Sequence, residues 1–221
     1  MVSLGYSKLF TYTMVGGMLW SAWSLYQAPP ALTDALICVA FSFVATDLIS
    51  GLLHLVLDNP RSLALAPIRG LAQGFQRHHE KPANIYEMPL YQHLYVMHMP
   101  LTFLFVAVVP FGNAAMHVVF LSMVTALHVM QMAHLWAHLP PERVPAAVRV
   151  LQKTRVLLSK PQHDLHHAAP FDRDFCIMTG ICNRPLNAVV SVIGPTTHWW
   201  LAIFAFSAIS PLILAFVLSL L

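Results

Sequence analysis

The sequence predicts an all-α, polytopic integral membrane protein that forms a single domain over residues 1–221. Of the 221 residues, 57% are apolar and only 10% are charged. Soluble domains carry about 25% charged residues, because they must cover a water-facing surface. The apolar residues also gather in long segments, and the basic residues gather between those segments. These three observations exclude a soluble globular protein and a disordered chain.

Four apolar segments are candidates for membrane-spanning helices, which need about 20 mainly apolar residues. In chain order they cover residues 9–26, 31–57, 94–109 and 114–136. Pro29 and Pro30 separate the first two segments, and a turn at residues 110–113 separates the last two, because proline cannot continue a helix. We therefore expect two helical hairpins. A further apolar segment, residues 199–221, contains Pro211 and forms either a fifth span or a re-entrant or interfacial segment.

The basic residues predict how these hairpins are oriented. Two polar stretches, residues 58–92 and 140–184, hold 11 of the 12 Lys and Arg residues, and Lys8 precedes the first span. The turns between paired spans have none. Because basic loops remain on the cytoplasmic side of a membrane, we expect the N-terminus and both polar stretches to be cytoplasmic.

Histidine is unusually abundant, with 13 residues against 12 Lys and Arg together. Each imidazole needs a polar partner in apolar surroundings, and imidazole is a common metal ligand. The predicted topology brings eight histidines from four separate segments to the cytoplasmic membrane surface. They are His54, His78, His79, His134, His138, His163, His166 and His167.

The spacing of these histidines is typical of metal ligands. His54 and Asp58 lie four residues apart at the end of a predicted helix, and so do His134 and His138, so each pair shares one helix face. Residues 163–167 read HDLHH. Imidazole and carboxylate ligands suit iron, copper, nickel or zinc. Eight histidines exceed the needs of one ion, so the sequence predicts a cap that holds two metal ions.

Other polar residues have supporting or simpler interpretations. Asp47 lies two helical turns before His54, and we expect its carboxylate to accept the free N–H of a ligating histidine. Arg77, Lys81 and Arg155 are candidates for contact with anionic lipid headgroups. The five remaining histidines are expected to be structural or exposed: His93, His98, His117, His128 and His198. No phosphate-binding glycine motif is present, and no nucleic-acid partner is expected.

Five motifs occur together in this chain. They are DLISGLLH at 47–54, FQRHH at 75–79, HLWAH at 134–138, HDLHH at 163–167 and FCIMTG at 175–180. This combination resembles the lipid desaturase family that includes plasmanylethanolamine desaturase (the Kua proteins) and the plant plastid desaturase acting on phosphatidylglycerol palmitate. The likeness covers about residues 31–190. HxxxH or HxxHH alone would not be specific, whereas the histidine boxes together with the FCIMTG segment are.

The resemblance implies a membrane-bound, non-haem di-iron enzyme that uses two iron ions and O2 to insert a double bond into a phospholipid chain, either alkyl-ether or fatty-acyl. The eight histidines match the family's histidines, and Asp58 matches its acid. A separate electron donor, cytochrome b5-like or ferredoxin-like, is also implied. The plasmanylethanolamine branch has one more histidine after the double histidine, where this chain offers only Glu87 or His93. The resemblance therefore does not by itself assign the vinyl-ether substrate of that branch to this chain.

Three other functions use similar residues. A membrane hydroxylase of sterol or carotenoid type would share the histidine array and would differ in the mass of its product. A zinc-dependent membrane hydrolase would show no O2 dependence. The third alternative is non-enzymatic: a haem-binding electron carrier, which would show a Soret band, or a metal-sensing membrane module, which would consume no oxygen. Histidines on one membrane face argue against haem, which needs axial ligands within the helix bundle.

Overall fold

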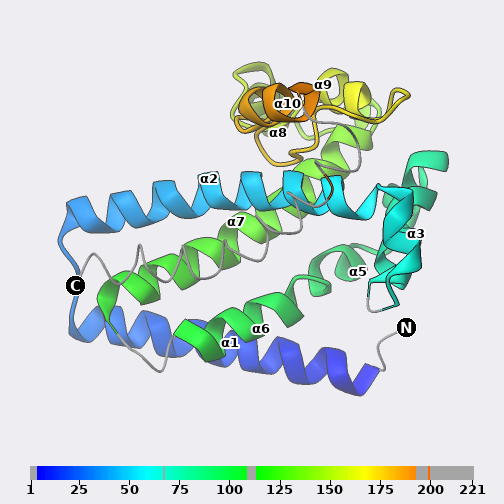
Figure 1. Cartoon of the computed structure of the whole chain (residues 1–221). Coiled ribbons are helices and arrows are strands. Elements are labelled where there is room, and N and C mark those ends of the chain that lie inside the picture. The colour runs from blue at the N-terminus through cyan, green and yellow to red at the C-terminus, as the bar shows by residue number, and fades with distance from the viewer. Residues whose placement is uncertain (1–3, 67, 109–112, 193–198, 200–221) are drawn as a thin grey trace. The chain divides into compact units, whose positions relative to one another are not determined.

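The structure is a computed structural model that describes residues 4–66, 68–108, 113–192 and Trp199. All regular elements in this part of the chain are helices (Figure 1), which agrees with the predicted all-α class. Packing divides the chain into two compact units, and each is described by itself. Helices α2 (Leu32–Leu57) and α7 (Ala114–His138) run through both units.

Local sequence sets the ends of these two long helices. Helix α2 follows Pro29 and Pro30, and α7 begins where the Asn113 side chain accepts a hydrogen bond from the Met116 N–H at 2.8 Å. Such caps satisfy N–H groups that the first helical turn leaves free. Among the described residues, α2 and α7 are the two helices that are long and apolar enough to cross a membrane. They indicate a membrane protein and match two of the four predicted spans.

The first unit contains the described parts of residues 1–45 and 89–129. Its elements are α1 (Leu4–Gln27), α5 (Leu90–Tyr95), α6 (His98–Val108) and the first parts of α2 and α7. Helix α1 packs along α6, and Thr102 Oγ1 donates a hydrogen bond to the Phe10 carbonyl at 2.9 Å. Ser21 and His117 meet at 3.1 Å between α1 and α7. Buried polar side chains thus tie apolar helices together, as is common in membrane proteins.

The third predicted span differs from the structure, because residues 94–109 do not form one helix. Helix α5 ends at Tyr95, a turn follows, and α6 begins at His98. Pro100 has no N–H to donate to the carbonyl of Val96, so a helix cannot run unbroken through this point. Residues 109–112, which belong to the predicted hairpin turn, lie outside the described residues.

The second unit contains the described parts of residues 46–88 and 130–209. It joins the last parts of α2 and α7 to seven short helices. These are η1 (Pro60–Ala64), α3 (Arg69–Glu80), α4 (Asn84–Glu87), η3 (Pro141–Arg143), α8 (Ala146–Lys153), α9 (Lys160–His166) and α10 (Asn183–Val192). Ser159 and Gln162 form a capping box that starts α9.

The core of the second unit lies between the end of α2, the segment 175–182 and α10. It consists of Leu52, Leu55, Phe175, Cys176, Cys182, Leu186 and Val190. Gly51 lets this segment approach α2, because a Cβ at that position would lie 2.5 Å from Cys176 Sγ and 2.8 Å from Leu186 Cδ2. The predicted C-terminal apolar segment lies outside the described residues apart from Trp199, whose Nε1 donates to Ser62 Oγ at 3.0 Å.

Candidate metal centre

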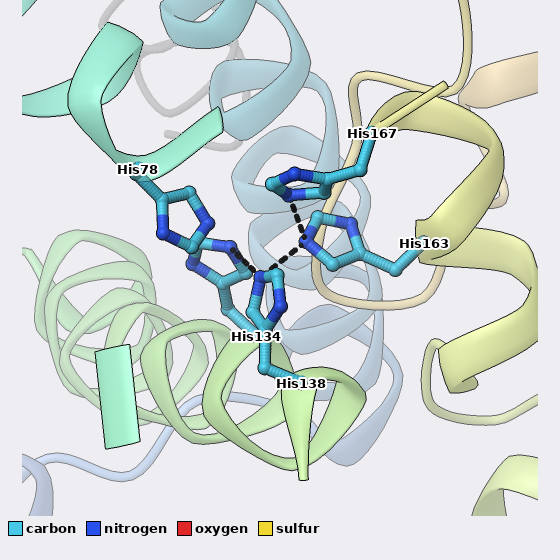
Figure 2. Close-up of side chains that lie close together, drawn as sticks. All are labelled: His78, His134, His138, His163 and His167. Atoms are coloured by element: carbon cyan, nitrogen blue, oxygen red, sulfur yellow. Dashed lines mark hydrogen bonds between the residues drawn. The ribbon is translucent and has the colours of Figure 1, made fainter. Parts of the chain in front are cut away.

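Five histidines of the second unit converge on one point (Figure 2). Their ligand nitrogens all lie within 4.8 Å of one another, and the residues are His78 from α3, His134 and His138 from α7, and His163 and His167 from α9 and the residue after it. The ring nitrogens Nε2 approach closely. The distances are 2.8 Å from His163 to His138, 3.2 Å from His138 to His134 and 3.2 Å from His167 to His163.

A second group lies beside the first. His54 from α2, Asp58 and His166 from α9 place their ligand atoms within 4.8 Å of one another. His166 Nε2 is 3.3 Å from Asp58 Oδ2, and His79 Nε2 from α3 is 3.1 Å from Asp58 Oδ1. The His166 ring centre lies 5.6 Å from that of His167, so α9 contributes ligands to both groups. The eight predicted histidines and Asp58 are therefore all brought together.

The first group fits a metal ion better than it fits a set of hydrogen bonds. The Nε2 atoms of His138 and His163 each face two other nitrogens, but an imidazole nitrogen offers only one proton or one lone pair. A cation at the centre would accept all of these lone pairs. Bonds of about 2.1 Å from histidine to metal place neighbouring ligand nitrogens about 3 Å apart in an octahedral site, close to the observed 2.8–3.2 Å.

The second group passes the same test through its buried polar atoms. Both carboxylate oxygens of Asp58 are buried, and they face the buried Nε2 atoms of His79 and His166 at 3.1 and 3.3 Å. Buried carboxylate and imidazole atoms this close are costly in a protein interior unless a proton or a cation lies between them. A cation between the carboxylate and the imidazoles removes that cost, so these residues also fit a metal ion.

Backbone carbonyls orient two of the imidazoles. His54 Nδ1 lies 2.8 Å from the Ser50 carbonyl, and His166 Nδ1 lies 3.0 Å from the Arg173 carbonyl. A carbonyl can only accept, so each Nδ1 carries the proton and each Nε2 presents a lone pair to the site. These supporting groups were not found from the sequence. Ser50 precedes His54 by one helical turn, but nothing in the sequence indicates the role of Arg173.

Burial and neighbouring charges keep these side chains in the protonation state that binds a metal ion. Burial lowers the pKa of His78 to about 3 and of His167 to about 2, and the pKa of His163 is also well below its ordinary value. These rings are therefore neutral near pH 7. Burial would raise the pKa of Asp58, but interactions with His166 and His79 outweigh it and hold that pKa below its ordinary value. Asp58 is therefore a carboxylate.

The predicted partner of Asp47 is wrong. Among the described residues no histidine donates its N–H to the Asp47 carboxylate, and the N–H of His54 goes to the Ser50 carbonyl instead. Asp47 Oδ1 instead accepts the N–H groups of Thr179 and Gly180 at 2.8 and 3.0 Å, and Oδ2 accepts that of Cys182 at 3.0 Å. Asp47 thus fastens the loop at residues 179–182 to α2, since three amide dipoles stabilise its charge.

The remaining candidates lie elsewhere. Arg77, Lys81 and Arg155 are all exposed, and of these Arg77 lines a surface pocket on α3. Glu87 is exposed at the end of α4, outside both groups of ligands. The other histidines of the described chain belong to the first unit. There His93 is buried in α5, His98 bonds to Thr11, His117 to Ser21 and His128 to the Val124 carbonyl.

Fold and site together define a helical, membrane-type protein with a histidine and carboxylate cluster that can bind metal. A model of the lipid desaturase domain matches residues 43–192, which is more than half of the chain and includes all nine candidate ligands. The chain therefore belongs to the lipid desaturase family.

Named relatives agree with this family. The chain is 28% identical over 182 residues to chloroplastic fatty acid desaturase 4-like 1 of Arabidopsis thaliana, covering 80% of this chain and 58% of the relative. It is 27% identical over 146 residues to chloroplastic fatty acid desaturase 4 of the same plant, covering 66% and 45%.

Another relative carries the name of the plasmanylethanolamine desaturase branch. Plasmanylethanolamine desaturase of Myxococcus xanthus is 27% identical over 180 residues, covering 75% of this chain and 60% of the relative. The chain thus spans about half of the length of the curated relatives it matches. No solved structure matches the chain.

Proposed function

We propose that the protein is an O2-dependent, di-iron lipid desaturase that inserts a double bond into an alkyl-ether or fatty-acyl chain of a phospholipid. The observation that carries the proposal is the convergence of eight histidines and Asp58 into two adjacent ligand groups. Membership of the lipid desaturase family favours lipid oxidation, and the relatives' names include both acyl and alkyl-ether desaturases.

The protein's own residues would act by holding, orienting and shielding. His78, His134, His138, His163 and His167 would hold one iron ion, and His54, His79, Asp58 and His166 the other. When bound, the iron pair would supply activation of O2 for hydrogen removal from an unreactive methylene. The Ser50 and Arg173 carbonyls would hold two of the ligand rings in place, and the burial of the ligands would limit the access of water to the site.

Several properties belong to the same proposal. The lipid chain would enter from the bilayer, and electrons would come from a separate cytochrome b5-like or ferredoxin-like donor. We also infer that the chain crosses the membrane four times as one desaturase domain, with its N-terminus and histidine clusters on the cytoplasmic side. The distribution of the basic residues supports this orientation.

Metal content and lipid products measured together test the function. The wild-type protein and His163→Gln are expressed in cells, the lipids are analysed by mass spectrometry, and iron is counted in the purified proteins. We expect new alkenyl-ether or monounsaturated acyl species, two mass units lighter than their precursors, with wild type only. His163→Gln should lose iron and turnover while still inserting into the membrane.

His128→Gln is the matched control, because His128 bonds to its own helix in the first unit. It should retain both iron and product. Wild-type protein that binds iron but adds oxygen, sixteen mass units, would instead identify a hydroxylase. Full turnover by His163→Gln would contradict the assignment of the metal site.

A further inference from the structure

A surface pocket of about 430 Å³ lies on helix α3, next to the candidate metal centre. It is lined by Leu63, Arg69, Gln73, Gln76, Arg77 and Glu80. The five lining residues from α3 fall within an arc of about 100° on a helix with 3.6 residues per turn. His78 and His79 lie on the other side of the same helix, toward the ligand groups. A single helix therefore separates the pocket from the metal centre.

Two guanidinium groups are held in place at this pocket without a carboxylate partner. Arg69 Nε donates to the Leu63 carbonyl at 2.8 Å, and Arg77 Nε donates to the Gln73 carbonyl at 3.1 Å. No carboxylate of the described residues forms an ion pair with either arginine. Each Nε bond leaves the Nη groups available for an anion, and arginine is the preferred side chain for binding phosphate oxygens.

The charges of the lining residues select a class of anion. Two guanidinium cations and the Glu80 carboxylate leave one net positive charge at the pocket. A phosphodiester carries one negative charge and matches it, whereas a phosphomonoester carries about −1.5 to −2 at neutral pH. Gln73 adds an amide donor for the phosphate oxygens, and Leu63 adds an apolar wall.

We propose that this pocket binds the phosphodiester of the phospholipid substrate, with Arg69 and Arg77 as its anion ligands. The proposal rests on the proposed function, because it takes the substrate to be a phospholipid. The pocket would hold the headgroup about one helix diameter, roughly 10 Å, from the metal ligands. It also differs from the headgroup contacts expected from the sequence, since it includes Arg69 and omits Lys81 and Arg155.

Direct binding to the purified, iron-loaded protein in a non-ionic detergent tests the pocket. The probes are dihexanoylphosphatidylglycerol, glycerophosphoglycerol without acyl chains, inorganic phosphate and dihexanoylglycerol, measured by calorimetry. The variants are Arg69→Gln and Arg77→Gln. The matched control is Arg61→Gln, because Arg61 is exposed in the same unit but does not line the pocket. Iron content is measured in every sample.

We expect the phosphatidylglycerol probe to bind about tenfold more weakly to each pocket variant, since a charge-assisted hydrogen bond is lost. Iron content should be unchanged, and Arg61→Gln should bind like wild type. Dihexanoylglycerol, which has no phosphate, should bind weakly, and its affinity should be the same for wild type and for every variant. The acyl-free diester should lose affinity in the same two variants.

Three results would overturn the pocket assignment. They are unchanged phospholipid affinity in both variants, an equal loss in Arg61→Gln, and inorganic phosphate binding as tightly as the lipid, which would make this a free phosphate site. None of these results affects the proposed function. That function fails separately if wild-type protein binds no iron and forms no unsaturated product, while the variants still lose lipid binding.

Discussion

At the scale of single residues, the two ligand groups differ in chemistry. The first consists of five imidazoles, whereas the second combines imidazoles with the carboxylate of Asp58. A carboxylate brings a negative charge that a cation can neutralise, and the buried Asp58 carboxylate lies within 3.3 Å of two imidazole nitrogens that the same cation would bind. Asp58 should therefore matter most for the second ion.

Asp58→Asn should lower bound iron from two ions to about one per chain, because the five-imidazole group stays intact while the second loses its charge. Atomic absorption on purified protein measures this. The control is Asp164→Asn, since the exposed Asp164 carboxylate pairs with Lys160 at 2.7 Å and with no other basic side chain among the described residues. Retention of two ions by Asp58→Asn would remove the carboxylate from the set of ligands.

Acid should destabilise the metal-free protein. The folded-state pKa values of His78 and His167 lie at about 3 and 2, below the value of about 6.5 for an unfolded histidine. The unfolded chain therefore binds more protons, and stability is fully present above pH 6.5 and falls as the pH decreases toward 3. Each such histidine steepens the dependence by up to about 1.4 kcal/mol per pH unit.

The midpoint of thermal unfolding of chelator-treated protein, recorded from pH 7.5 to 4, measures this effect. His78→Gln removes one of the titrating groups and should give a shallower dependence than wild type. The same midpoint at every pH would mean that these rings are not buried in neutral form.

At the scale of elements, helix α2 and the segment 175–182 support the ligands together. Asp47 and Ser50 on α2 accept amide N–H groups from this segment, including that of Ile177 at 3.1 Å. The Phe175 ring packs at 5.3 Å against the ring of His166. The FCIMTG segment thus has a structural role, because its backbone is bound to the helix that carries His54.

Gly51→Ala should disturb this contact. The new Cβ would lie 2.5 Å from Cys176 Sγ, so the segment must move away from α2. We expect about 1–3 kcal/mol of destabilisation and weaker retention of iron, measured by thermal unfolding and metal analysis.

Gly74→Ala is the control, since no atom of the described part of the chain lies within 4 Å of a Cβ there and the residue is exposed on α3. It should stabilise the protein by about 0.5–1 kcal/mol through helix propensity. Equal stability of the two variants would contradict the packing of α2 against the segment.

At the scale of the whole molecule, the proposed topology places the turn after α1 and the histidine-bearing segments on opposite sides of the membrane. The three native cysteines are buried, so they should give little background in labelling. Gln27 and Glu142 are both exposed and serve as probe positions. Gln27→Cys should react with a membrane-impermeant maleimide in intact cells, and Glu142→Cys only after permeabilisation. Labelling of both from the same side would overturn the orientation.

Much of the site followed from the sequence because metal ligation leaves a local signature. HxxxH puts two rings on one helix face, and HDLHH puts three rings within five residues, whatever the rest of the chain does. Helices α2 and α7 were equally predictable, since apolar length and flanking turn residues determine them. The break at residues 96–97 could have been predicted from Pro100, but the apolar composition of residues 94–109 obscured it.

The sequence by itself determined the helical class, the membrane character, the family and the set of candidate ligands, because composition and short-range spacing carry that information. Only the tertiary structure decided how those ligands divide into two groups, that Asp47 holds a backbone loop, and that Arg69 joins Arg77 in a pocket. These features depend on contacts between residues far apart in the chain. Such contacts arise from packing, which no local pattern specifies.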